Sequence, residues 1–159
     1  MSQRIDASRQ SPKLFHKLIE FSNLLHDSTI GRAILDLVSI RASQLNGCGF
    51  CVDMHVKEAS LHGERALRLH HLAIWRESTL FAPRERAALA WTEVLTRLPE
   101  PGVPDEIYER VRTQFSEAEL SDLSFAVMAI NAWNRLNVGF RTVPGSADKA
   151  YGLDRANLS

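Results

Sequence analysis

The residues most capable of chemistry are the two cysteines of the chain, Cys48 and Cys51. Two cysteines placed at random would fall three positions apart in roughly 1 of 80 cases, so this spacing indicates a functional pair. If Cys48 begins a helix, Cys51 lies one turn later on the same face, within reach of a disulfide. In a compartment that keeps thiols reduced, such a pair indicates redox catalysis, redox sensing or metal binding.

His55 follows Cys51 by four positions and is expected on the same helix face. The backbone N–H groups of a helix start favour a thiolate there. A fall in thiol pKa from ~8.5 to ~6 increases the thiolate about thirtyfold at neutral pH, but the loss of nucleophilicity leaves only about a twofold gain. A positioned proton donor contributes about 10²–10⁴-fold, so His55 is expected to carry more of the rate.

Asp36 is placed near His55 by the lengths of two expected helices. It stands ~15 Å before the end of the first helix, near Gly47, and His55 stands ~10 Å into the next. If these helices fold back as an antiparallel hairpin, Asp36 and His55 lie within about one turn of the same level. We therefore expect Asp36 to orient His55, directly or through water.

Apolar residues recur at helical spacing along the chain, without the alternation typical of strands. Seven helices are expected, at about 12–25, 30–46, 48–63, 64–75, 83–98 and 104–115 and from the Ser116 capping box onward. Short connections between them predict an all-α domain of packed helical hairpins.

This helical domain is expected to span residues 11–145. An N-terminal extension at 1–10 precedes it, and a polar tail at 146–159 follows it and is expected to be loosely held. A length of 159 residues fits one domain, and 45% apolar residues suffice for a core.

Composition limits the classes of partner. The 19 basic and 19 acidic residues balance, which gives no reason to expect nucleic acid or a membrane surface. Without a secretory signal or a long apolar run, the sequence predicts a cytoplasmic protein that does not cross a membrane. No G-x-G-x-x-G loop follows a strand, so no cofactor is expected, and reducing power must come from another protein or a small thiol.

The stretch from Asp36 to His55, with Ser43-Gln-Leu-Asn-Gly-Cys48-x-x-Cys51-x-x-Met-His55, resembles the alkylhydroperoxidase D branch of the carboxymuconolactone decarboxylase family. Segments 75–93 and 131–135 are similar to the family as well, so that the resemblance covers most of residues 11–145. Two positions depart from the pattern. Asp36 stands where the family usually has Glu, and Phe50 stands where alkylhydroperoxidase D proteins have a histidine between the cysteines.

The resemblance implies an all-helical protein assembled into trimers or hexamers that reduces hydroperoxides. It implies that Cys51 becomes the sulfenic acid, that Cys48 resolves it to a disulfide, and that an external thiol or dithiol restores the pair. The decarboxylases of the family typically lack the cysteine pair, so decarboxylation is disfavoured.

Other interpretations of the same residues remain open. The protein could be a non-enzymatic redox-sensing oligomer, or Cys48, Cys51 and His55 could hold a structural zinc ion, although no fourth ligand is evident. The pair could also be two small buried apolar side chains. Lys57 and Glu58 are expected to be solvated.

Overall fold

The computed structural model describes residues 2–158, and every regular element in that range is helical. The helices are α1 (Ala7–Gln10), α2 (Pro12–Leu24), α3 (Arg32–Asn46), α4 (Gly49–Leu61), α5 (Ala66–His71), α6 (Pro83–Arg97), α7 (Asp105–Arg112), α8 (Glu117–Phe140) and α9 (Asp148–Tyr151). Three 3-10 helices accompany them, η1 (Leu25–Asp27), η2 (Leu72–Ile74) and η3 (Leu153–Ala156). The all-α expectation is confirmed. The seven expected helices correspond to α2–α8, and the unexpected α1 and α9 are single turns, too short to show a periodic pattern.

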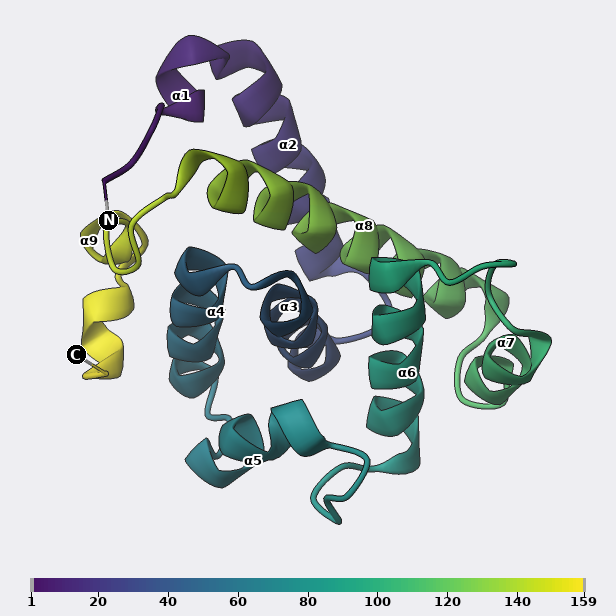
Figure 1. Ribbon diagram of the computed structural model, residues 1–159. Coiled ribbons are helices and arrows are strands. Elements are labelled where there is room, and N and C mark those ends of the chain that lie inside the picture. Colours follow the sequence, from purple (N-terminus) through teal and green to yellow (C-terminus); the bar gives the residue numbers. More distant parts are fainter. Residues whose placement is uncertain (1, 159) are drawn as a thin grey trace.

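The antiparallel hairpin of α3 and α4 is the part of the fold that positions the cysteines. Gly47 ends α3 in the left-handed conformation, with φ of 65°, which glycine adopts without strain. Cys48 follows at once as the N-cap of α4, so only two residues join the helices. The centre of the molecule is α3, with α4, α6 and α8 packed around it (Figure 1).

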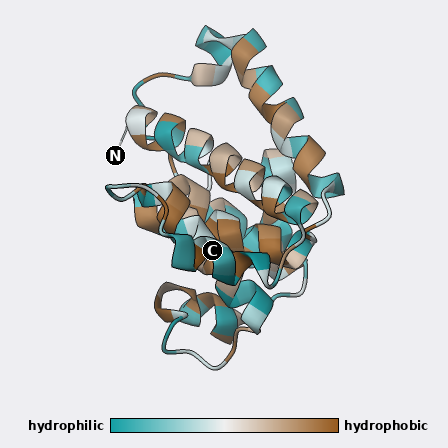
Figure 2. Ribbon diagram, turned by 90° about the vertical axis from the view of Figure 1, so that its right-hand side faces the viewer, coloured by the Kyte–Doolittle hydropathy of each residue, from teal (hydrophilic) through white to brown (hydrophobic). Residues whose placement is uncertain are grey.

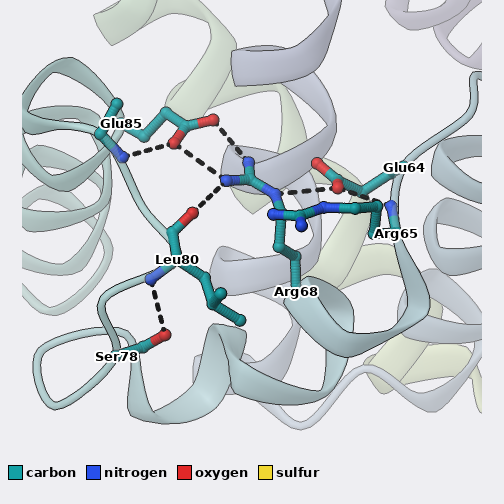
Figure 3. Close-up of polar contacts among 7 residues, drawn as sticks. Glu64, Arg65, Arg68, Ser78, Leu80 and Glu85 are labelled. Carbon is teal, nitrogen blue, oxygen red and sulfur yellow. Dashed lines mark hydrogen bonds and ion pairs between the residues drawn. The ribbon is translucent and has the colours of Figure 1, made fainter.

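Arg68 fixes the connection between α5 and α6, at the far end of the hairpin (Figure 3). Its guanidinium donates to Glu64 at 2.9 Å, to Glu85 at 2.5 Å and to the backbone carbonyl of Leu80. Arg68 is 9% exposed, so these partners replace nearly all its contact with water. Removing one side of such a buried pair costs about 3–5 kcal/mol, which makes this network a firm support for the fold.

The segment after residue 145 is packed against α4, and the expectation that it is loosely held is wrong (Figure 1). Leu153 of η3 is only 3% exposed. The ammonium of Lys57 lies 2.7 Å from the Asp148 carboxylate and 2.9 Å from that of Asp53, and Asp53 also accepts the backbone N–H of Gly145 at 3.0 Å. Lys57 is therefore a buried clamp between α4 and this segment, not the solvated side chain that was expected.

The N-terminal extension is anchored at the end of α8. The backbone N–H of Arg4 donates to the carbonyl of Phe140 at 2.8 Å, and its guanidinium donates to that of Gly139 at 3.1 Å. These contacts satisfy carbonyls that a helix end leaves without partners. Among residues 2–158, no helix combines the length and apolar character needed to cross a membrane.

The helix α2 lies at the periphery, and α1 and α2 project beyond the packed body (Figure 1). None of its residues is buried, and Leu14 and Leu24 are 75% and 70% exposed. Apolar and polar bands alternate along it in Figure 2. It contacts α8 through Trp133, whose indole N–H donates to Ser22 at 2.8 Å and whose ring meets Phe15 edge-on.

Candidate redox-active site

Cys48 and Cys51 form a disulfide across the first turn of α4, with 5.3 Å between their Cα atoms. The disulfide expected across this turn is therefore present. Cys48 has an extended backbone, as an N-cap does, and its sulfur accepts the N–H of Cys51 at 3.3 Å. The residues are 1% and 2% exposed, so the chemistry of the pair depends on what surrounds it.

A cavity of about 740 Å³ reaches one residue of the pair. Cys51 is among its lining residues, and Cys48 is not. Aromatic and apolar side chains dominate the walls around Cys51, namely Phe50, Met54, Trp133 and Phe140. The volume lies within the ~300–1,000 Å³ typical of small-molecule sites. A molecule in the cavity would therefore meet Cys51 first.

His55 lines the same cavity and is paired with Glu58, one turn further along α4. Its Nδ1 lies 2.7 Å from Oε2 of Glu58, and because an ionised carboxylate can only accept, Nδ1 carries the proton. Burial opposes ionisation of Glu58, yet the hydrogen bond with His55 holds the pKa of this carboxyl below its ordinary value. Nε2 of His55 is thus the nitrogen left to exchange protons. Glu58 is half-buried, with its side chain 28% exposed, so it is only in part the solvated residue that was expected.

Asp36 lines the cavity from α3 and is bonded to His62, not to His55. His62 Nδ1 lies 2.8 Å from the Asp36 carboxylate, and its Nε2 lies 3.1 Å from a guanidinium nitrogen of Arg32. A guanidinium only donates, so Nε2 of His62 accepts from Arg32 and its Nδ1–H donates to Asp36. Burial raises the pKa of Asp36 above its ordinary value, against the opposing effect of His62.

The direction of side chains on the hairpin explains the partner of Asp36. Asp36 stands about 15 Å from the end of α3. Measured from the start of α4, His55 stands at about 9 Å and His62, just after the helix, at about 20 Å. Helical side chains lean toward the N-terminus of their helix. In an antiparallel hairpin the start of α3 lies beside the end of α4, so the side chain of Asp36 leans toward the end of α4. The side chain of His55 leans the opposite way, toward the start of α4. A direct hydrogen bond between Asp36 and His55 is not made, and each has another partner, His62 for Asp36 and Glu58 for His55.

Asn137 of α8 contacts the Cys51 sulfur, and no pattern in the sequence indicated this contact. Its side-chain nitrogen lies 3.6 Å from Sγ of Cys51. It stands 86 positions along the chain from Cys51, so local spacing could not reveal the contact. Glu58, by contrast, stands three positions after His55, and that helical spacing could have found it.

The zinc interpretation has no cluster to support it in the described part of the chain. Among residues 2–158, no group of three or more His, Cys, Asp or Glu side chains is arranged to hold a metal ion. The sulfurs of Cys48 and Cys51 are bonded to each other, and Nδ1 of His55 is bonded to Glu58. Metal analysis of the purified protein remains the direct test of a zinc site.

Comparison with known proteins identifies the family. Residues 12–94 match the model of the carboxymuconolactone decarboxylase family. The chain belongs to this family. The uncharacterised protein YdfG of Bacillus subtilis is 38% identical to this family member over 138 residues, which cover 87% of this chain and 94% of YdfG.

Solved structures place this carboxymuconolactone decarboxylase family member in the alkylhydroperoxidase D-like branch. ATU0492 from Agrobacterium tumefaciens, whose crystal structure is known, is 38% identical in sequence to this chain. It is described as a protein of unknown function and is linked by name to the antioxidant defence protein AhpD. It matches with a TM-score of 0.87 over 90% of this chain and 98% of that one. A peroxidase-related protein with an AhpD core from Ralstonia eutropha shares the fold at 17% identity, with a TM-score of 0.78 over 88% of this chain and 75% of that one.

Proposed function

We propose that this protein is a thiol-dependent peroxidase that reduces hydroperoxides through Cys48 and Cys51. The observation that carries the proposal is the disulfide-bonded pair, one residue of which, Cys51, lines a cavity that the His55–Glu58 pair also lines. Membership of the alkylhydroperoxidase D-like branch supports a peroxidase-related, antioxidant role. Cys51 is the attacking residue because it faces the cavity, and Cys48 is the resolving residue.

The oxidative steps begin at Cys51. Nε2 of His55 takes the thiol proton of Cys51, and the resulting imidazolium is stabilised by Glu58. The thiolate attacks the terminal oxygen of the hydroperoxide, so that an S–O bond forms and the O–O bond breaks. The departing alkoxide takes the proton from His55 and leaves as an alcohol. Cys48 then attacks the Cys51 sulfenic acid, the S–S bond forms, and the hydroxyl leaves with the Cys48 thiol proton as water.

The reductive steps use an external thiol or dithiol that enters the cavity. Its thiolate attacks the Cys51 sulfur, the S–S bond breaks, and Cys48 departs as a thiolate. Because the Cys48 sulfur accepts the N–H of Cys51 at the start of α4, the charge develops where it is stabilised. A second thiol attacks the mixed disulfide and releases reduced Cys51. The reductant thereby supplies two electrons and two protons.

In the proposed mechanism, Asp36 is part of the cavity wall. Asp36 and Arg32 line the cavity and are joined through His62, which makes a second hydrogen-bonded group separate from the His55–Glu58 pair. We assign the proton transfer to His55 and Glu58, and we assign Asp36 a positioning role that its amide variant tests.

The protein is expected to work as a homo-oligomer, a trimer or a hexamer as the resemblance implies. The exposed Leu14 and Leu24 on α2, a helix without a buried residue, support an assembly through this helix. Light scattering on a sizing column measures the subunit number. The cytoplasmic location expected from the sequence stays a prediction.

Stopped-flow oxidation of the reduced protein tests the function. Hydrogen peroxide and an organic hydroperoxide should each convert the two thiols to the Cys48–Cys51 disulfide faster than they oxidise a free thiol. The Cys51→Ser variant should lose this reaction, whereas Cys48→Ser should consume one equivalent and stop at the sulfenic acid. Oxidation no faster than that of a free thiol would sink the peroxidase proposal, and a change of size on oxidation would then favour a redox-sensing oligomer.

A further inference from the structure

Asn137 lines the cavity on α8, directly beside the sulfur to which the proposed function gives the attacking role. Its side-chain nitrogen lies 3.6 Å from Cys51 Sγ and 3.0 Å from the backbone carbonyl of Trp133. An amide nitrogen carries two hydrogens, so both contacts can be made at once.

The carbonyl of Trp133 fixes which end of the Asn137 amide faces the sulfur. If the amide were turned over, its oxygen would face the carbonyl oxygen of Trp133, and neither could donate. The nitrogen is therefore held toward both groups, and a hydrogen points at Cys51. The donor is in place before any charge appears on the sulfur.

The two sulfurs have different donors. Cys48 Sγ accepts a backbone N–H at the start of α4, whereas Cys51 Sγ accepts the side chain of Asn137 from a different helix. Within residues 2–158, Asn137 is the one side chain that donates to Cys51 Sγ. Because Cys51 is only 2% exposed, a negative charge there would have little water to stabilise it.

We infer that Asn137 is a catalytic residue whose amide stabilises negative charge on the Cys51 sulfur. The inference rests on the proposed function, in which Cys51 carries that charge twice. It does so first as the thiolate that attacks the hydroperoxide. It does so again when the reductant's second thiol breaks the mixed disulfide and Cys51 leaves. A preformed donor at a buried atom stabilises charge without reorganisation at the moment of reaction.

The test is a thiol titration that needs no enzymatic turnover. In a Cys48→Ser background Cys51 is the chain's one cysteine, so its pKa can be read from thiolate absorbance against pH. Asn137→Leu removes the donor and keeps similar bulk, and it should raise the Cys51 pKa by about one unit. Asn137→Asp keeps the shape but adds a charge that repels the thiolate, so it should raise the pKa further.

The same change predicts a rate. At a pH well below both pKa values, one unit lowers the thiolate population about tenfold, while the more basic thiolate reacts about threefold faster, which leaves alkylation by iodoacetamide about threefold slower. The matched control is Val138→Ala, the next residue on α8, whose side chain is 45% exposed. It should leave both pKa and rate unchanged. His55, Glu58 and Asp36 line the same cavity and are present in every variant, so the differences report the amide.

The outcomes separate this inference from the proposed function. A Cys51 pKa that stays within about 0.2 units of the parent in a folded Asn137→Asp or Asn137→Leu protein would overturn the role of Asn137. The Asp variant is isosteric and serves if the Leu variant does not fold. Failure of the intact pair to react with hydroperoxides, together with the expected rise in pKa, would overturn the function and leave the donor established.

Discussion

Replacing Lys57 by methionine should release the segment that carries α9 and η3 from α4. The ammonium lies 2.7 Å from Asp148 and 2.9 Å from Asp53, and its side chain is only 8% exposed. Methionine keeps most of the apolar stem but cannot donate. The two carboxylates would then face each other across the contact without the cation between them.

The magnitude follows from the two hydrogen bonds that are lost. A hydrogen bond to a charged group contributes about 1.5–3 kcal/mol when well buried. The carboxylates of Asp53 and Asp148 are 28% and 23% exposed, so water recovers part of this loss. We expect the Lys57 variant to lose ~2–3 kcal/mol in the stability of the docked segment, less than the ~3–5 kcal/mol of a fully buried pair.

Limited proteolysis with trypsin measures this opening, since Lys149 and Arg155 lie in the segment. When opening is faster than cleavage, the cleavage rate follows the open population. A loss of this size should therefore speed cleavage by roughly 30- to 150-fold, with urea unfolding as a second measurement. The control is Lys17→Met. Lys17 is 76% exposed and pairs with Glu20 at 2.6 Å, so this variant should change stability by less than ~0.5 kcal/mol.

A cleavage rate that rises less than threefold in the Lys57 variant would refute the clamp. Equal losses from Lys57→Met and Lys17→Met would refute the reasoning in another way. That result would mean that burial adds nothing to the ion pair.

Three further predictions concern single side chains. Glu58→Gln should slow hydroperoxide turnover at least tenfold, because His55 loses its anionic partner. Asp36→Asn should slow turnover less than threefold. The reverse order of the two effects would place Asp36 in the proton transfer. Because burial raises the pKa of Asp36, folding binds a proton between its unfolded and folded pKa values and stability falls as pH rises through that window. Asp36→Asn, whose side-chain oxygen can still accept from His62, should therefore raise the free energy of unfolding at neutral pH. This gain should vanish below the pKa of Asp36 in the unfolded chain. Urea unfolding that shows the same gain at every pH would contradict the prediction. Ser116→Ala should lower the free energy of unfolding, measured in urea, by about 1 kcal/mol, because the Ser116 hydroxyl caps α8. An unchanged free energy would show that this cap contributes no stability.

Local signals in the sequence predicted most of the fold. Pro12 and Pro83 mark the starts of α2 and α6, the Ser116 capping box marks α8, and Gly47 marks the end of α3. Each acts through its own backbone or a neighbour three residues away, so it can be read without knowledge of the tertiary structure. The helical hairpin beneath the cysteines followed from these signals.

The contacts that complete the site could not be predicted in the same way. Asn137 and Asp148 reach Cys51 and Lys57 from 86 and 91 positions away, and only packing brings them together. The partner of Asp36 was missed for another reason. Axial distances placed it near His55, but the lean of helical side chains decided the pairing in favour of His62.

Different segments of the chain supply the reactive residues of the cavity and the rest of its walls. Cys51 and the His55–Glu58 pair lie on α4, whereas residues such as Ile5, Ser8, Thr142 and Tyr151, from segments near the two ends, complete the walls. Substitutions in those segments change the shape of the cavity and leave the donors to Cys48 and Cys51 untouched. A library randomised at these wall positions would thus explore which molecules are accepted while the reactive centre stays constant. In the proposed peroxidase, selectivity and reactivity would therefore be traits that can be mutated separately.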